Sequence, residues 1–201
     1  MSVTVIKLGG SLMRSVELSA WLASIESLAT NTNIIIVPGG GEFADKVRET
    51  QALCKFDDQY AHRMALLAMS QYGYLLAGIN PRLQIVEDID ALPLNLSMKM
   101  PLLWLPTTLI QDDSEIPASW DFTSDSIALW LAIKLAAHRL ILVKSKDLTN
   151  AKLLINNHIE NNDLDKGFQQ LTDKYSGKIY FMEKKQYTLL TDHVNDDVTP
   201  Q

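Results

Sequence analysis

The segment VTVIKLGG, residues 3–10, decides the fold. Its apolar and β-branched residues predict a buried strand, and the two glycines predict a tight turn after it. A helix is expected over residues 15–29, before the break at residues 31–33. The same order then repeats, with IIIV at residues 34–37, PGGG at residues 38–41 and a predicted helix over residues 42–53. Apolar strands that lead through glycine into a helix are typical of a parallel sheet with helices on both faces.

The rest of the chain continues this alternation. We expect helices over residues 57–78, 123–137 and 163–172, strands over residues 83–86, 102–105, 140–143 and 178–181, and a helical turn over residues 186–190. The predicted fold is therefore α/β, a three-layer α/β/α sandwich with a mainly parallel central sheet. Because no fixed-period repeat or low-complexity linker interrupts the sequence, residues 1–190 are predicted to form a single domain and residues 191–201 a flexible C-terminal tail.

Composition excludes several classes of protein. Of the 201 residues, 47% are hydrophobic and 21% charged, which is typical of a soluble globular chain. A net charge of −6, with no basic cluster longer than Lys184-Lys185, argues against a nucleic-acid partner. No apolar run approaches the roughly 18 residues that span a bilayer, so no membrane partner is expected. The N-terminus lacks the pattern of a signal peptide, and we expect a cytoplasmic protein.

Loops that follow the apolar strands carry the candidate chemistry. In open α/β sheets, ligands bind beyond the carboxyl ends of the strands. Glycines there let backbone N–H groups approach a phosphate, and the next helix adds its partial positive charge. We expect three loops to form one anion site: Gly9-Gly10-Ser11, Gly39-Gly40-Gly41 and Lys144-Ser145-Lys146-Asp147.

Lys7 is the most informative single residue, because burying a lysine in an apolar strand is unfavourable unless its ammonium meets a counter-charge. With glycines beside it, we expect Lys7 to bind a phosphoryl group; the alternative is a lysine that extends from an edge strand into solvent. The sequence contains neither G-x-x-x-x-G-K-[ST] nor G-x-G-x-x-G, so the common nucleotide loops are excluded.

Three motifs in order resemble the signatures of the amino acid kinase superfamily: VIKLGGSL at residues 5–12, IVPGGG at residues 36–41 and TSDSIA at residues 123–128. The resemblance implies the sandwich fold, a phosphotransferase, and ATP with Mg²⁺ as cofactors. It also implies that Lys7 holds the transferring phosphoryl group, that glycines of both turns donate backbone N–H groups, and that Asp125 orients the catalytic lysines. No separate metal site made of protein ligands is predicted.

The chain departs from the superfamily pattern after residue 143. Of the usual nucleotide loop only Asp147 remains, and a later segment with a lysine is missing. The second catalytic lysine is Lys144 or Lys146, and we favour Lys144 because it directly follows the strand. The alternative is that both are solvated loop lysines.

Within the superfamily, residues 58–72 and Trp120 most resemble the kinases of methanofuran-type cofactor synthesis, which phosphorylate 5-(aminomethyl)-3-furanmethanol phosphate. That branch implies an acceptor with both a phosphate and an ammonium group. We expect four residues to contact the acceptor: Asp58, His62, Thr123 and Ser124. An Asp58–His62 pair that only stabilises its helix is equally consistent with the sequence.

Other functions remain open at this stage. A carboxylate or nucleoside-monophosphate kinase of the same superfamily would carry the same motifs, and the altered loop at residues 144–148 also allows a non-catalytic protein that binds a nucleotide or oxyanion. A small phosphate or carboxylate acceptor and a homo-oligomer are the expected partners. Trp104, Trp120 and Trp130 are predicted to pack in the core or at a subunit contact, because no basic residues lie among them in the sequence.

Overall fold

The computed structural model describes residues 2–92, 99–107, 116–146 and 164–195. Its six strands are β1 (Val3–Leu8), β2 (Asn33–Pro38), β3 (Gln84–Val86), β4 (Leu102–Trp104), β5 (Arg139–Lys144) and β6 (Lys178–Glu183). The α-helices are α1 (Leu18–Ala29), α2 (Gly41–Cys54), α3 (Asp58–Ile79), α5 (Ser124–Lys134), α7 (Lys166–Thr172) and α8 (Leu190–Asn195). Short 3₁₀ helices cover Gly10–Leu12, Ile89–Ala91 and Tyr187–Leu189.

All six strands pair in parallel, in the order β3-β4-β2-β1-β5-β6. β1 therefore lies at the centre between β2 and β5, although β5 comes more than 130 residues later in the chain. Because all strands point the same way, the loops after β1, β2 and β5 meet at one edge of the sheet. This is the edge at which the sequence places its glycines and lysines.

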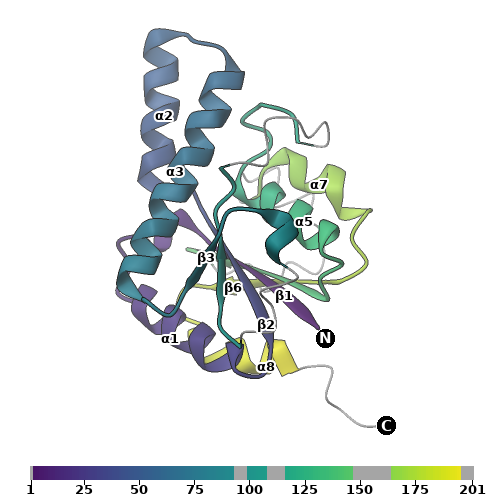
Figure 1. Ribbon diagram of the computed structural model, residues 1–201. Helices are drawn as coiled ribbons and strands as arrows, with labels where there is room; N and C mark the ends of the chain where they lie inside the picture. The colour runs from purple at the N-terminus through teal and green to yellow at the C-terminus, as the bar shows by residue number, and fades with distance from the viewer. Residues whose placement is uncertain (1, 93–98, 108–115, 147–163, 196–201) are drawn as a thin grey trace.

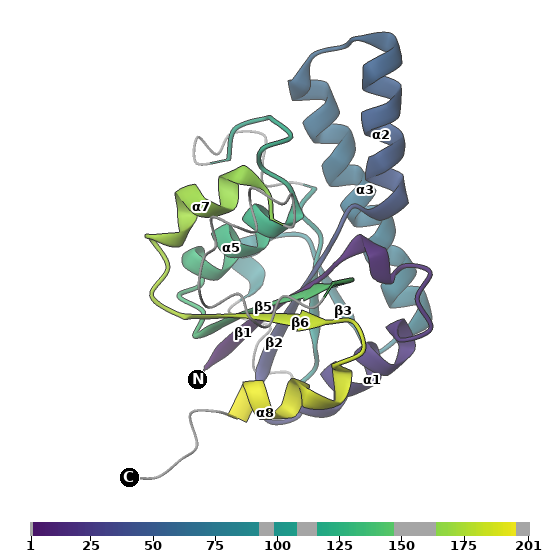
Figure 2. The same cartoon turned by 180° about the vertical axis from the view of Figure 1, so that it is seen from behind.

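Helices cover both faces of the sheet (Figures 1 and 2). α5 and α7 pack on the face that buries Val5, and α1 and α8 pack on the face that buries Ile6. α2 and α3 lie side by side as a hairpin that extends away from the layers in Figure 1. The three-layer α/β/α sandwich with a parallel sheet, predicted from the alternation of strands and helices, is confirmed.

Strand alternation determines where the two lysines of the edge point. Successive side chains of a strand face opposite sides of the sheet, so Lys7 shares the α5 face with Val3 and Val5. On β5, Lys144 follows the same rule with Leu140 and Leu142, which also face α5. Lys7 lies opposite Leu142 in the parallel register, and the two lysines therefore reach toward the start of α5 from adjacent strands.

Several element predictions need correction. The first helix begins at Leu18, and residues 15–17 precede it. The helix expected to reach residue 137 ends at Lys134, and the one expected from residue 163 begins at Lys166. The expected flexible tail over residues 191–201 is wrong for its first part, because α8 extends to Asn195 and buries Leu190 and Val194 in the α1 core. Residues 196–201 lie outside the described part of the chain. Among the described helices, none combines the length and hydropathy needed to cross a membrane.

Candidate active site

Lys7, Asp125 and Lys144 form the centre of the site. Lys7 and Asp125 are both 5% exposed, and Lys7 Nζ lies 2.8 Å from Asp125 Oδ1. The ammonium of Lys144 donates a hydrogen bond to the other oxygen, Asp125 Oδ2. Two strands and one helix thus bring two cations onto a single carboxylate, which leaves the cluster with a net positive charge. Such a cluster is suited to bind an anion that completes the neutralisation.

The pKa values in this cluster follow from burial and mutual attraction. Burial alone would raise the pKa of Asp125, but Lys7 and Lys144 together lower it to about 2, so the carboxylate is ionised at neutral pH. Burial lowers the pKa of Lys7, and the neighbouring charge of Lys144 lowers it further, whereas Asp125 opposes this shift. Asp125 therefore favours the protonated form of Lys7, and a bound phosphate would add to that effect.

Asp165 supports this centre at the N-terminus of α5, and the sequence pattern did not identify it. Thr123, the residue before α5, makes no side-chain cap of its own helix. Asp165 Oδ2 instead accepts from Thr123 N at 2.8 Å and from Thr123 Oγ1 at 2.6 Å, and both carboxylate oxygens also bond Ser126. The same carboxylate caps α7 by accepting from Phe168 N at 3.0 Å. One residue thereby fixes the start of the helix that presents Asp125.

The only sequence signal for Asp165 was an aspartate at a helix start, which predicts a cap for α7 but not the contact with α5. Its pKa is raised, first by burial and then by the nearby charge of Asp125, while its hydrogen bonds to Ser126 and Thr123 oppose the shift. Burial and the negative neighbour thus favour the protonated form, whereas the capping bonds favour the carboxylate.

The two glycine turns pack backbone against backbone at the carboxyl edge. A Cβ added to Gly10 would lie 2.2 Å from Gly41 Cα, and one added to Gly39 would lie 2.6 Å from Gly10 N. Gly41 also has φ +53, a left-handed conformation that side chains disfavour. Glycine is therefore required here for close approach. The result is a side-chain-free surface at the N-terminus of α2, as a phosphate site needs.

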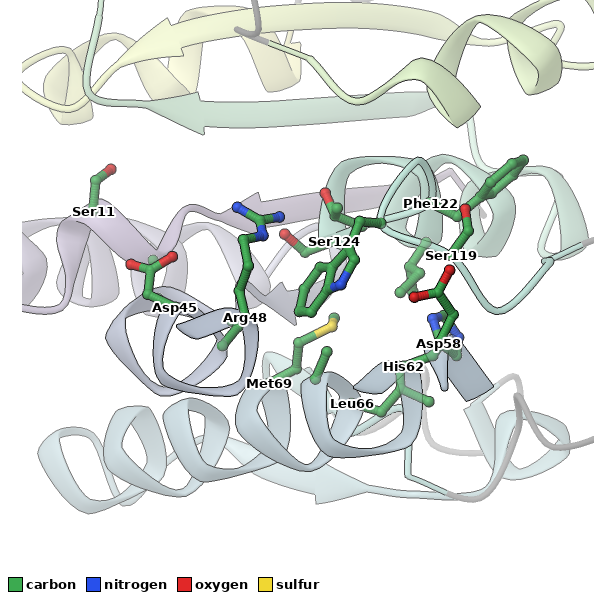
Figure 3. A pocket seen from close by; sticks show the side chains of 18 of the residues that line it. Ser11, Asp45, Arg48, Asp58, His62, Leu66, Met69, Ser119, Phe122 and Ser124 are labelled. Atoms are coloured by element: carbon green, nitrogen blue, oxygen red, sulfur yellow. The ribbon is translucent and has the colours of Figure 1, made fainter. Parts of the chain in front are cut away.

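A cavity of about 440 Å³ opens beside the turns and the lysines. Gly10, Ser11, Gly40, Gly41 and Lys144 line one end of it. Leu66, Met69 and Ile127 add apolar surface, and Asp58, His62 and Ser119 lie toward the other end, as Figure 3 shows for the labelled residues. A site with convergent polar groups and an apolar middle is typical of a small-molecule pocket.

Trp120 lies in this cavity, against the prediction that it packs in the core or at a subunit contact. The guanidinium carbon of Arg48 is 4.4 Å from the centre of the Trp120 ring, a cation–π contact. The indole Nε1 donates to Gln51 Oε1 at 2.6 Å. The prediction failed because it searched for basic residues near Trp120 in the sequence, whereas Arg48 is 72 positions away. Trp104 and Trp130, by contrast, are buried and stack on each other in the core as predicted.

Asp58 and His62 both line the cavity, but they are not hydrogen-bond partners of each other. Asp58 Oδ1 accepts from Gln51 Nε2 at 2.7 Å. The His62 side chain is buried, and its Nε2 has no hydrogen-bond partner among the described residues. Burial lowers the pKa of His62, so its imidazole is neutral at pH 7. His62 lines the cavity, but its unpartnered Nε2 is itself buried.

The other predicted site residues are placed as follows. Thr123 and Ser124 line the cavity beside Trp120. Gly9 and Gly39 lie behind its surface and allow the turns to pack closely. Ser145 and Lys146 are exposed and absent from the cavity wall, and Asp147 lies outside the described residues. Of the two candidate lysines, Lys144 is the one that reaches Asp125.

The residues present fit the phosphate part of ATP. The glycine surface and the net positive cluster offer backbone donors and cations to its oxygens. The described residues hold no group of three or more His, Cys, Asp or Glu side chains that could bind a metal ion. Mg²⁺ commonly binds through phosphate oxygens and water with only one or two carboxylates, so this donor set is compatible with Mg²⁺ that arrives with the nucleotide.

Comparisons with known proteins agree with this geometry. The model of the amino acid kinase family matches residues 2–155. A relative from Methanocaldococcus jannaschii, [5-(aminomethyl)furan-3-yl]methyl phosphate kinase, is 26% identical over 145 residues, which are 71% of this chain and 66% of that protein. The match thus spans slightly less than two thirds of the relative's length.

Solved structures show the same fold at low identity. Uridylate kinase from Archaeoglobus fulgidus has a TM-score of 0.72 and 16% identity, with 91% of each chain covered. UMP kinase from Ureaplasma parvum has a TM-score of 0.71 and 13% identity, with 96% of this chain and 95% of that chain covered. Together with the three motifs and the family match over most of the sequence, they lead to one conclusion: the chain belongs to the amino acid kinase family.

Proposed function

We propose that this protein is an ATP-dependent kinase that transfers the γ-phosphoryl group to a small phosphate monoester carrying an ammonium group, 5-(aminomethyl)-3-furanmethanol phosphate or a close analogue. The observation that carries the proposal is the buried cluster in which Lys7 and Lys144 share Asp125 at the glycine-lined end of the cavity. The relative from M. jannaschii supports the choice of acceptor by its name.

In the proposed reaction, an oxygen of the acceptor phosphate forms a bond to the γ-phosphorus of ATP. The bond from that phosphorus to the bridging oxygen breaks, ADP leaves, and the acceptor becomes a diphosphate. Negative charge spreads over the γ-phosphoryl oxygens during transfer, and Lys7 and Lys144 are placed to neutralise it from two strands. Mg²⁺, when bound with ATP, would supply further positive charge to the phosphate oxygens.

Asp125 acts in this scheme as an orienting residue. Its carboxylate contacts both lysines, so it would hold the two ammonium groups in position and favour the protonated form of Lys7 against the effect of burial. No general base is required, because a phosphate monoester has its second pKa near 6 and is already ionised at neutral pH. Backbone N–H groups of the glycine turns would orient the phosphates of the nucleotide.

A panel of acceptors tests the proposal. Purified protein with Mg²⁺ and ATP is given the aminomethyl-furanmethanol phosphate, UMP, isopentenyl phosphate, acetylglutamate or aspartate, and ADP formation is measured. We expect transfer to the first acceptor that falls at least about a hundredfold in Lys7→Met. Lys46→Met is the matched control, because Lys46 is exposed and pairs with Glu49 on α2.

The outcomes separate the alternatives. Transfer to UMP or a carboxylate in place of the aminofuran phosphate would replace the acceptor named here. ATP binding without transfer to any of the acceptors would favour the non-catalytic reading. Equal activity in wild type and Lys7→Met would contradict the role of the lysine cluster itself.

A further inference from the structure

Beyond the lysine cluster, the cavity carries opposite charges on two antiparallel helices. Gly41, Asp45 and Arg48 follow one another at helical spacing along α2, and Asp58 and His62 do so at the start of α3. α3 runs back along α2, so Asp58 lies beside Gln51, near the far end of α2. In Figure 3 the order across the cavity is Asp45, Arg48 and then Asp58 with His62.

We propose that this cavity recognises its acceptor by two separate charges, with Arg48 binding the phosphate and Asp58 binding a primary ammonium at the opposite end of a small apolar ring. This inference rests on the proposed function, because it assumes that the acceptor is a phosphate monoester. It adds the residues that select the acceptor and the end of the cavity that each group occupies.

Arg48 is suited to the phosphate. Among the described residues no carboxylate forms an ion pair with it, and its guanidinium lies 4.4 Å from the centre of the Trp120 ring. Trp120 is in turn fixed by its bond to Gln51. A planar guanidinium held on an aromatic face keeps its N–H donors free to bind a phosphate in pairs. Arg48 also lies between the glycine end and Asp58, where an acceptor phosphate would face the nucleotide.

Asp58 is suited to the ammonium. Gln51 holds Asp58 through one oxygen, Oδ1, which leaves the other oxygen available. Asp58 therefore offers an ammonium a carboxylate. A hydroxyl in the same place would lack the charge attraction. His62 lines the same end of the cavity one helical turn later, but it is only 7% exposed and its unpartnered Nε2 is itself buried.

Gln51 positions the side chains that recognise both charged groups of the acceptor, Arg48 through Trp120 and Asp58 directly. Its amide nitrogen donates to Asp58 at 2.7 Å, and its amide oxygen accepts from Trp120, on which Arg48 stacks. This geometry requires an amide side chain, because the same group must donate a hydrogen bond to the Asp58 carboxylate and accept one from the Trp120 indole. The side chain therefore sets the relative positions of the two recognition groups.

The apolar middle of the cavity would contact the furan ring of the acceptor. Leu66 and Met69 from α3 and Ile127 from α5 contribute this surface to the wall. A furan with two one-carbon arms would place its phosphate and its ammonium on either side of that surface. A nucleoside monophosphate has no ammonium for Asp58.

Two acceptors of the same shape test the inference: the aminomethyl-furanmethanol phosphate and its analogue with a hydroxymethyl group in place of the aminomethyl group. We expect wild type to prefer the amine in kcat/KM by roughly ten- to a hundredfold, the range of a charge-assisted hydrogen bond. Asp58→Asn should remove most of that preference and change kcat/KM for the hydroxyl compound by less than about threefold. Asp57→Asn, one residue earlier and outside the cavity wall, should retain it.

Three other variants test the separate roles of Arg48, His62 and Gln51. Arg48→Met should lower kcat/KM for both compounds by a similar factor and leave their ratio unchanged, because both carry the phosphate. His62→Ala should raise KM for the amine more than KM for ATP. Gln51→Leu should reduce the preference for the amine without changing KM for ATP, which a merely destabilised protein would not do.

Calorimetric titration of both compounds without nucleotide keeps the test independent of transfer. Wild type should bind the amine more tightly than the hydroxyl compound, and Asp58→Asn should bind them equally. An unchanged ratio in Asp58→Asn, in transfer or in binding, overturns the inference. If wild type binds the amine selectively but transfers no phosphoryl group to it, the proposed kinase function fails while the recognition site stands.

Discussion

Asp125→Asn removes the charge that both buried lysines contact while preserving the shape of the side chain. In the native protein Asp125 pairs with Lys7 and Lys144, and all three groups lie at the edge of the sheet. The variant places two ammonium groups next to a neutral amide in a buried site. We expect a large loss of stability at neutral pH and a further fall in the pKa of Lys7, since Asp125 is the main group that raises it.

The magnitude follows from the carboxylate. Its pKa falls from 3.8 to about 2 on folding, which corresponds to roughly 2 to 3 kcal/mol because one pKa unit is about 1.4 kcal/mol. Removing one partner of a buried ion pair costs about 3 to 5 kcal/mol in other proteins. We therefore expect Asp125→Asn to lower the free energy of unfolding by about 2 to 5 kcal/mol at pH 7.

The pH dependence has a definite sign. Asp125 ionises at a lower pH in the folded chain than in the unfolded chain, so its contribution is complete above the unfolded pKa and disappears as the pH falls toward 2. Asparagine does not titrate. The difference in unfolding free energy between wild type and Asp125→Asn should therefore be constant from about pH 7 to 5 and become smaller below about pH 4.

Urea unfolding followed by tryptophan fluorescence and circular dichroism measures this difference at several pH values. Asp165→Asn is a demanding control, because Asp165 is part-buried beside the same helix start but its pKa is raised. Its titration favours the folded state at lower pH, so the difference between wild type and Asp165→Asn should grow as the pH falls. An Asp125→Asn variant as stable as wild type at pH 7, or a difference that does not shrink in acid, would refute the ion-pair reasoning.

Three further predictions concern the phosphate end. Gly10→Ala should raise KM for ATP at least about tenfold, because its Cβ would lie 2.2 Å from Gly41 Cα; Gly78→Ala, where no atom lies within 4 Å of the added Cβ, should leave steady-state kinetics unchanged. Lys144→Met should lower kcat by about a hundredfold or more with a smaller effect on KM for ATP, and an unchanged kcat would show that another group neutralises the transferring phosphoryl. The pH profile of kcat/KM should fall on its alkaline side below 10.5, because burial lowers the pKa of Lys7 in the free enzyme and the charged form is the active one; a profile still flat at pH 10.5 would contradict this.

The sequence alone determined the elements and their order. The strands, and the glycine turns that follow β1 and β2, are encoded by neighbouring residues, so the parallel sandwich and the glycine-lined edge could be predicted. Lys7 was also predictable, because a charged side chain in an otherwise apolar strand needs a counter-charge. The local pattern in VTVIKLGG thus located the centre of the site.

The tertiary structure decided which residues complete that centre. The sequence favoured Lys144 over Lys146 because Lys144 directly follows the strand, and the structure adds that Lys144 lies on the same sheet face as Lys7 and contacts Asp125. Asp165 caps α5 from 42 positions after Thr123, a pairing that no local pattern encodes.

The contacts at the far end of the cavity could likewise not be predicted from local sequence. Arg48 and Gln51 meet Trp120 only because the α2–α3 hairpin lies against the segment that precedes α5. The expected flexible tail was wrong for a similar reason, since Val194 is buried by contact with α1 and not by its sequence neighbours. Local hydrophobic pattern fixes secondary structure, whereas ion pairs, caps and ligand-facing side chains depend on chain segments that come together only when the sheet is assembled.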